Sequence, residues 1–239
     1  MRHSAIFVSD SYAVSADYRA KLAKADTVYG HTAVHPDELG GHFDFADWRG
    51  NKISKANFLG RWTFLYFGYA RCHGSCQAAA PELAEAARTL RDRGFAAKAA
   101  FVDIEAPMLG GIQRIDLDDY EMNHGSNWSK RYAMGWMALR HGIDIEVLSG
   151  SRLQLSQATA AYHVMREHVP PRKSEDGMSI NHSSSIYLIG PDTLVAGYGY
   201  HDMGADAMVE MVETLSKAER NPIDLTAIKR RYITGICGE

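Results

Sequence analysis

The fold of this chain is decided by the stretch Trp62-Thr-Phe-Leu-Tyr-Phe-Gly-Tyr-Ala-Arg-Cys72-His-Gly-Ser-Cys76-Gln-Ala-Ala-Ala-Pro81-Glu-Leu83. The unbroken apolar run up to Gly68 shows no polar alternation, which predicts a strand buried on both faces inside an α/β sheet. A run with helical spacing begins directly after the two cysteines. A strand that leads into a helix brings the residues between them to the carboxyl edge of the sheet, where α/β proteins bind ligands. We therefore expect Cys72 and Cys76 at this edge, beside a helix N-terminus whose partial positive charge lowers a thiol pKa.

The spacing of the two cysteines indicates which thiol chemistry they support. Residues four apart on a first helical turn share one face, so the sulfurs can form a disulfide or share a metal ion. Cys-x-x-x-Cys is one residue longer than the redox motif Cys-x-x-Cys. Two thiolates suit a soft ion such as Cu(I), and imidazole suits copper in either oxidation state. The alternative, two buried cysteines without a chemical role, is disfavoured by their position between a strand and a helix.

Composition excludes several classes of protein. The 239 residues can bury a sizeable core, as one large domain or one domain with extensions. The net charge is -3 and the longest basic cluster is Lys229-Arg230-Arg231, so nothing electrostatic favours nucleic-acid binding. No apolar stretch approaches the roughly 20 residues that span a bilayer, and the first ten residues lack the apolar core of a signal peptide. Three cysteines are too few for a disulfide framework, and we interpret Cys237 as an incidental thiol.

The predicted architecture is a thioredoxin-like, three-layer α/β sandwich with an N-terminal β-hairpin extension. We predict three regions: an N-terminal extension over residues 1–40, the thioredoxin-like domain over 41–220 and a C-terminal tail over 221–239. Further predicted elements, in chain order, are a helical piece at 18–25, a hairpin at 41–54, a helix at 81–93, strands at 96–102 and 143–148, a helix at 151–168, a hairpin turning at 190–192 and a helix at 204–220. The residues expected to face inward from the helix at 151–168 are Leu153, Leu155, Ala158, Ala161, Tyr162 and Met165.

His182 is the second informative residue. It comes directly before a predicted core strand, in a loop of small residues that can approach the cysteines. Thioredoxin-like redox enzymes hold a cis-proline before this strand, whereas the sequence here is Ser184-Ser185-Ile186 without a proline. A lone histidine is usually a satisfied polar residue, and we take that interpretation for most of the eleven histidines. A two-thiolate site that needs a third ligand favours a metal-binding role for His182.

Four segments in register resemble the Sco/SenC family, over about Gly40 to Leu215. They are Gly40-Gly-His-Phe-Asp-Phe45, Phe58-Leu-Gly-Arg followed by the strand and Cys72-x-x-x-Cys76, Phe101-Val-Asp103, and His182-Ser-Ser-Ser-Ile-Tyr-Leu-Ile-Gly-Pro-Asp192. The resemblance implies a thioredoxin-like fold and copper, as Cu(I) or Cu(II), held by Cys72, Cys76 and His182. Family members supply copper to the binuclear site of cytochrome c oxidase, and some reduce disulfides. The implied partner is a copper-accepting oxidase subunit or another copper or thiol protein. Asp103 matches an acidic position that tunes the site or a partner's approach.

The sequence departs from the family pattern in several places. His73 and Gln77 replace both prolines of the usual Cys-Pro-x-x-Cys-Pro loop, which predicts a looser loop. The segment 108–140 is longer and more aromatic than expected; we interpret it as an elaboration packed on the domain, with a partner surface as the alternative. Family members are usually membrane-anchored and face the periplasm or the intermembrane space, whereas no anchor is visible in this sequence, so its location stays open.

Two functions from different classes remain. The first is a copper-binding assembly factor that passes on the ion by ligand exchange. The second is a thiol-disulfide oxidoreductase in which Cys72 attacks a disulfide and Cys76 resolves it. The cysteine spacing, the missing cis-proline and His182 favour the first; the lost loop prolines and the missing anchor count against it. In air we expect a Cys72–Cys76 disulfide, with Cys237 as the remaining free thiol.

Overall fold

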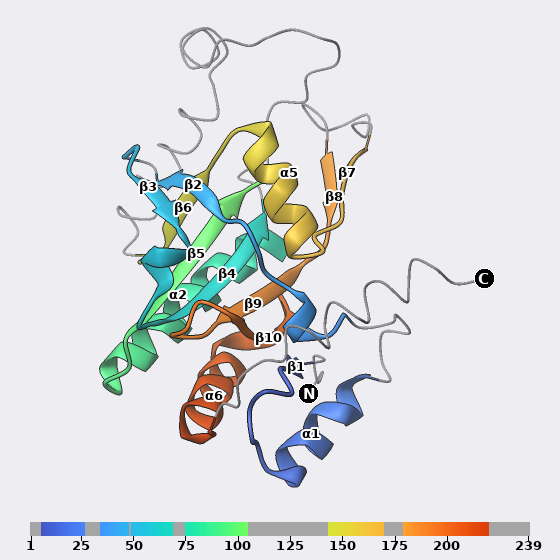
Figure 1. The fold of residues 1–239 in the computed structure, drawn as a ribbon, viewed down its shortest axis with the longest axis vertical. Helices are drawn as coiled ribbons and strands as arrows, with labels where there is room; N and C mark the ends of the chain where they lie inside the picture. The colour runs from blue at the N-terminus through green and yellow to red at the C-terminus, as the bar shows by residue number, and fades with distance from the viewer. Residues whose placement is uncertain are drawn as a thin grey trace, which may run out of the picture.

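The computed structural model describes residues 6–26, 34–47, 49–68, 75–104, 143–169 and 179–219. Figure 1 shows the strands and helices of this part of the chain. In order, the elements are β1 (Ile6–Val8), α1 (Ala16–Asp26), the 3₁₀ turn η1 (Pro36–Glu38), β2 (Asp44–Asp47), β3 (Lys52–Ser54), the 3₁₀ turn η2 (Lys55–Phe58), β4 (Trp62–Gly68), α2 (Ser75–Asp92), β5 (Ala97–Asp103), β6 (Glu146–Ser149), α5 (Arg152–Ala161), β7 (Arg166–Val169), β8 (Ser179–His182), β9 (Ser185–Ile189), β10 (Val195–Tyr200) and α6 (Gly204–Lys217). None of the described helices is both long enough and apolar enough to cross a membrane.

The main sheet has eight strands in the order β1-β10-β9-β4-β5-β6-β2-β3. β4 runs parallel to β5 and antiparallel to β9, and all seven of its residues are buried. The expected central strand is therefore confirmed in its position, bounds and burial. Its apolar run lacks alternation because both of its faces are covered.

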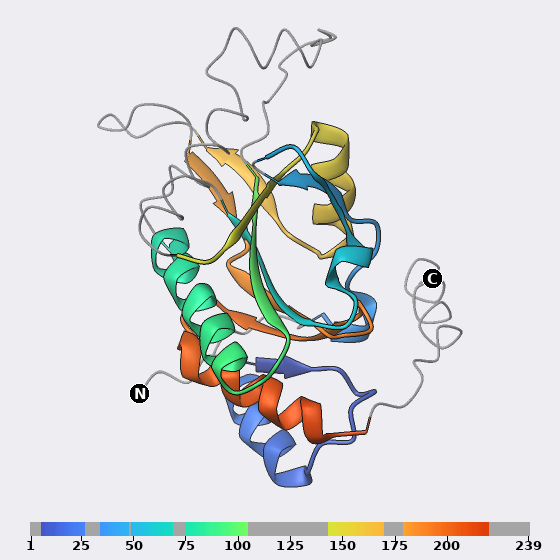
Figure 2. The same cartoon turned by 90° about the vertical axis from the view of Figure 1, so that its left-hand side faces the viewer.

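The side chains of β4 alternate between two cores. Trp62, Phe64 and Tyr66 pack with buried residues of α2 and α6, whereas Leu65 and Phe67 pack with residues of the β2–β3 hairpin and α5. Figure 2 shows α2 and α6 on one side of the sheet and α5 on the other. The sheet with helices on both faces is the three-layer α/β sandwich that the sequence predicts.

Helix α2 leads away from the sheet edge at which β4 ends. It begins at Ser75, so Pro81, where the sequence placed the start of the helix, lies inside it. Its apolar face is buried, and Leu83 and Leu90 are both fully inaccessible to solvent. Gly94 follows the helix at a φ of 87°, a conformation that glycine adopts without the strain of a Cβ atom. The predicted last helix is confirmed as α6, whose buried residues are Met208, Val209, Met211, Val212 and Leu215.

The helix predicted over 151–168 is wrong in its second half. α5 ends at Ala161, and residues 166–169 form β7 instead, which pairs with the unpredicted strand β8. His163 has a φ of 50°, which turns the chain out of the helical path. Two residues expected to face inward are exposed: Leu153, inside α5, is 67% accessible, and Met165, beyond its end, is 58% accessible. β6 also begins at Glu146, three residues later than expected.

Several predictions lie at the edges of the described structure or outside it. The hairpin over 41–54 is confirmed as β2 and β3, and the hairpin that turns at 190–192 as β9 and β10. The N-terminal segment contributes β1 to the edge of the main sheet, beside β10, which the sequence did not predict. The division at residues 40 and 220 stays a prediction. The segment 108–140 and the tail with Cys237 lie outside the described residues.

The turn between β2 and β3 depends on Asp47, which gives a first testable prediction. Its carboxylate accepts hydrogen bonds from the backbone amides of Arg49 and Asn51 and from the side chain of Asn51, each at 2.8 Å. Burial raises the pKa of Asp47, but these bonds outweigh it and leave the pKa below its ordinary value. We expect Asp47→Ala to lower the free energy of unfolding by about 1.5–3 kcal/mol, because the turn loses its hydrogen bonds to a charged acceptor.

The pH dependence gives the measurement a second readout. Because the carboxyl pKa is lower in the folded state, its contribution is complete above the unfolded value and is lost as the pH falls through the folded one. Urea unfolding at pH 7 and at pH 3 should therefore show the largest difference between Asp47→Ala and wild type at pH 7. Asp47→Asn, which keeps one acceptor oxygen, should lose less. Equal losses from Asp47→Ala at both pH values would contradict this account.

Candidate metal centre

His182 lies at the sheet edge where β4 ends. β4 and β9 pair antiparallel, with Tyr66 opposite Ile186, so the residues before β9 come to the end of β4 that leads toward the cysteines. The imidazole of His182 lies edge-on to the ring of Tyr66, with centroids 6.2 Å apart and planes at 75°. His182 therefore lies at this edge of the sheet, as predicted, beside the last residues of β4.

A hydrogen bond determines which nitrogen of His182 can bind a metal. Nδ1 of His182 lies 2.8 Å from the carbonyl oxygen of Ser183. Because a carbonyl only accepts, Nδ1 carries the proton and Nε2 carries the lone pair that a metal ion needs. Burial lowers the pKa of His182, opposed by the bond to Ser183, and a charge on His201 lowers the pKa further. The ring is thus held neutral, the form that ligates metals.

His182 is held by a two-stranded hairpin rather than by the loop that the sequence predicts. It is the last residue of β8 and lies opposite Arg166 of β7. Beyond this pair, Ser183 donates its backbone amide to the carbonyl of Met165 at 3.0 Å, and the Met165 amide donates to Ser183 Oγ at 2.9 Å. This pairing fixes the backbone on both sides of the imidazole, which limits the positions the ring can take.

The two cysteines are placed less completely. Cys76 is the second residue of α2, so its backbone lies in the first helical turn, as expected. Its side chain, all of Cys72 and all of His73 lie outside what the structure describes. Within the described residues, no three side chains of His, Cys, Asp or Glu come together in a way that could hold a metal ion. The ligand set of Cys72, Cys76 and His182 therefore stays a prediction.

Comparison with known proteins identifies the family. A family model described as SCO1/SenC matches residues 31–106 and 132–217. The chain belongs to the SCO1/SenC family. It is 27% identical over 181 residues to the human mitochondrial protein SCO2 homolog, covering 76% of this chain but only 61% of that protein.

Solved structures of the SCO1/SenC family share the fold. Arabidopsis thaliana ScoI with copper bound superposes with a TM-score of 0.56 at 20% identity, over 73% of this chain and 95% of that one. BsSco, described as a Sco-family cytochrome c oxidase assembly protein with a disulfide switch, superposes with a TM-score of 0.51 at 16% identity, over 76% of this chain and 95% of its own. The predicted thioredoxin-like fold is confirmed.

In this SCO1/SenC family member, Asp103 lies beside the same end of β4. It is the last residue of β5, pairs in register with Gly68, and is 3% exposed. The charge of Asp103 acts on Arg166 of the β7–β8 hairpin: burial lowers the pKa of Arg166, whereas the negative charge of Asp103 opposes this shift. A buried carboxylate therefore faces the hairpin that carries His182. Its predicted tuning role stays a prediction.

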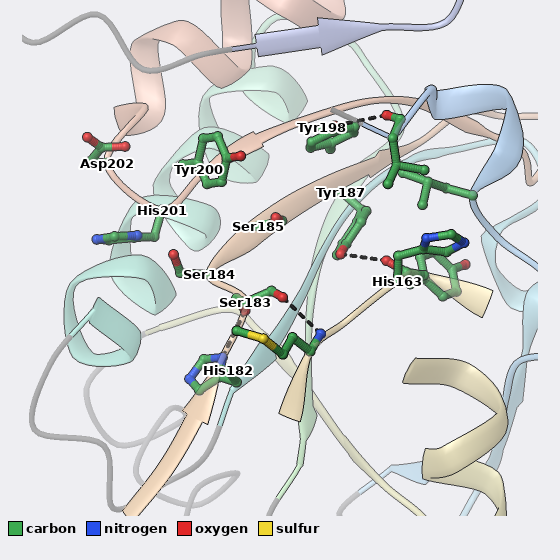
Figure 3. Close-up of a pocket in the computed structure, with 14 residues that line it drawn as sticks. His163, His182, Ser183, Ser184, Ser185, Tyr187, Tyr198, Tyr200, His201 and Asp202 are labelled. Atoms are coloured by element: carbon green, nitrogen blue, oxygen red, sulfur yellow. Dashed lines mark hydrogen bonds between the residues drawn. The ribbon is translucent and has the colours of Figure 1, made fainter. Parts of the chain in front are cut away.

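A cavity of about 640 Å³ opens beside His182 (Figure 3). Four tyrosines contribute to its lining: Tyr162, Tyr187, Tyr198 and Tyr200. Tyr187 donates its hydroxyl to the carbonyl of Tyr162 at 2.8 Å, and Tyr198 donates to the carbonyl of Val34 at 2.9 Å. These bonds satisfy the hydroxyls of Tyr187 and Tyr198 while their rings line the cavity.

His201 is a lining residue of this cavity that sequence reasoning missed. It follows β10 directly, and its backbone amide donates to the carbonyl of Ser184 at 2.9 Å. No spacing links it to His182 or to the cysteines, so no local pattern in the sequence could have singled it out. Only the pairing of β9 with β10 brings it to the same end of the sheet.

Proposed function

We propose that this chain is a copper-binding protein that delivers copper during assembly of the binuclear copper site of a respiratory oxidase. In this proposal Cys72, Cys76 and His182 hold the ion at the carboxyl edge of the sheet. The acceptor is an oxidase subunit or another copper or thiol protein. Membership of the SCO1/SenC family supports the proposal, as does the likeness to a family structure solved with copper bound.

The observation that carries the proposal is the placement of His182. Its ring contacts Tyr66, two residues before the end of the strand that leads into the cysteine segment. Its Nδ1 is engaged by Ser183, which leaves the Nε2 lone pair for a metal ion. Two thiolates and one neutral imidazole make a soft, three-coordinate set suited to Cu(I). Such a set can accept a ligand from an acceptor protein before it releases one of its own, which allows transfer by ligand exchange.

Copper binding can be tested by titrating the reduced full chain with Cu(I) against a competing chelator. We expect one equivalent to bind tightly to wild type and Cys72→Ser to lose this binding. His182→Ala should weaken the affinity by at least about 10–100-fold, the loss seen even for outer-shell partners of metal ligands. His42→Ala removes an exposed histidine of the described chain and serves as the matched control, which should bind as wild type does.

A second candidate function is thiol-disulfide exchange. Cys76 lies in the first turn of α2, where the helix dipole stabilises a thiolate, and the family relative BsSco is described with a disulfide switch. In this reaction the Cys72 thiolate attacks a substrate disulfide and Cys76 displaces the substrate, which leaves the substrate reduced and the two cysteines oxidised. Unchanged Cu(I) affinity in His182→Ala, together with rapid reduction of insulin disulfides, would replace the copper function by this one.

A further inference from the structure

Ser183 makes three hydrogen bonds that together join His182 to the neighbouring strand of the β7–β8 hairpin. Its carbonyl oxygen accepts from Nδ1 of His182 at 2.8 Å. Its backbone amide donates to the carbonyl of Met165 at 3.0 Å, and its hydroxyl oxygen accepts from the amide of Met165 at 2.9 Å. The dashed lines at Ser183 in Figure 3 are the bonds of its carbonyl and of its hydroxyl. One serine therefore holds the imidazole of His182 and the chain that enters β7.

The register of the hairpin shows that one of these bonds replaces a regular one. Arg166 lies opposite His182, so Met165 and Ser183 form the next pair of the ladder. Because the Ser183 amide donates to the Met165 carbonyl, this pair is of the kind in which each residue donates its amide to the carbonyl of the other. The return bond of a regular pair would run from the Met165 amide to the Ser183 carbonyl. Here the Met165 amide donates to the hydroxyl of Ser183 instead.

This exchange of acceptors leaves the Ser183 carbonyl to the imidazole. A serine hydroxyl accepts a hydrogen bond as a carbonyl does, so the Met165 amide stays satisfied at the end of the ladder. The carbonyl accepts from Nδ1 of His182, which holds the proton on Nδ1 and presents the lone pair of Nε2. Without the hydroxyl, the amide and the imidazole would have to share one carbonyl, and a ladder bond would align that carbonyl with β7 rather than with the imidazole.

We propose that Ser183 is a positioning residue for copper binding: its hydroxyl replaces its carbonyl in the ladder, so that the carbonyl holds the His182 imidazole with Nε2 free for the ion. The proposal rests on the proposed function, in which His182 binds copper, and adds the group that determines which ring nitrogen does so. Groups that hold the other nitrogen of a ligating histidine fix its tautomer and orientation, and their loss costs about 10–100-fold in metal affinity. Ser183 acts through His182 and not by contact with the ion.

The first measurement is the tautomer of His182 in the copper-free, reduced full chain, by long-range proton–nitrogen NMR at about pH 8, where a histidine ring is neutral. Wild type should carry the proton on Nδ1. Ser183→Ala should shift the population toward the tautomer with the proton on Nε2, because the Nδ1 proton loses its exclusive acceptor. Ser183→Thr keeps a hydroxyl on Cβ and should show the wild-type tautomer. Ser184→Ala is the matched control, because Ser184 accepts from the His201 amide through its backbone carbonyl, which alanine keeps.

The second measurement is Cu(I) competition on the same variants. Ser183→Ala should bind Cu(I) about tenfold more weakly, the lower end of what groups that orient metal ligands contribute. Ser183→Thr and Ser184→Ala should bind as wild type does. A purely structural role of Ser183 would leave the tautomer of His182 unchanged, so the two measurements together distinguish positioning of the ring from general destabilisation of the hairpin.

The outcomes separate this inference from the function on which it rests. An unchanged tautomer in Ser183→Ala overturns the inference, as does a failure of Ser183→Thr to preserve the wild-type tautomer. A changed tautomer with unchanged Cu(I) affinity overturns it as well, while the proposed function stands as long as Cys72→Ser and His182→Ala lose Cu(I). If His182→Ala leaves Cu(I) affinity unchanged, the proposed function fails, and Ser183 has no copper ligand to position.

Discussion

Tyr66→Ala should lower the free energy of unfolding by about 3–5 kcal/mol and also weaken copper binding, whereas Phe67→Ala should cause only the first effect. Both side chains are fully buried in β4. Tyr66 faces the core formed with α2 and α6, and its ring contacts Phe101 at 5.8 Å and His182 at 6.2 Å. Phe67 faces the opposite core, against Tyr162 at 5.5 Å and Tyr187 at 5.9 Å.

The two substitutions should differ because only one of them removes a contact of the His182 ring. Removing Phe67 creates a void beneath α5, away from the His182 ring. Removing Tyr66 takes away the aromatic edge against which that ring packs, so the imidazole is no longer held in one orientation. Loss of such an orienting contact should lower Cu(I) affinity by about 10–100-fold, as for other groups that position metal ligands.

Urea unfolding and Cu(I) competition, both at a temperature where each variant is folded, measure the two effects. Tyr66→Phe keeps the ring and should bind copper as wild type does. If Phe67→Ala weakened copper binding as much as Tyr66→Ala, the effect would come from general destabilisation and not from the contact with His182. A loss of 3–5 kcal/mol leaves part of the stability of an ordinary domain, about 5–15 kcal/mol, so both variants are measurable.

The sequence predicts the parts of the fold whose burial pattern is local. β4 is recognisable because seven successive residues are buried on two faces, and α6 because its apolar side chains recur at helical spacing. β1 is not recognisable, because three residues become a strand only through their pairing with β10. The hairpin of β7 and β8 is missed for a related reason. Helical spacing continues to Met165, and only the turn at His163 and a partner strand at 179–182 end the helix.

In the candidate site, too, local sequence patterns predict some residues and strand pairing alone places the others. His182 was predictable because chain order places it before a strand next to β4, and antiparallel pairing then brings it to the end of β4. His201 was not, because its nearness to His182 arises from the β9–β10 hairpin and leaves no motif. Asp103 was placed correctly at the end of β5, but its relation to Arg166 depends on the hairpin that the sequence missed. Tertiary pairing, not local pattern, decides which polar residues meet at this edge.

Gly197→Ala is the second substitution with a large expected effect, because position 197 lies where β10 meets β1. A Cβ atom there would lie 2.5 Å from the carbonyl oxygen of Phe7 and 3.4 Å from Cα of Val8. These are backbone atoms held by the β1–β10 ladder, so no side chain can rotate away. We expect the loss in the free energy of unfolding to reach or exceed the about 1–3 kcal/mol of ordinary overpacking, with β1 detached from the sheet.

Hydrogen exchange and urea unfolding can test this detachment. The amide of Ser9 donates to the carbonyl of Ala196 at 2.9 Å and should lose protection in Gly197→Ala, while amides of β4 keep theirs. The control is the same substitution in a chain that lacks residues 1–8, where the opposing carbonyl is absent and the added cost should largely vanish. An equal cost with and without β1 would instead assign the effect to the Sδ atom of Met211, 3.5 Å from the same Cβ. In that case α6, and not the N-terminal strand, would be the element that requires glycine at this position.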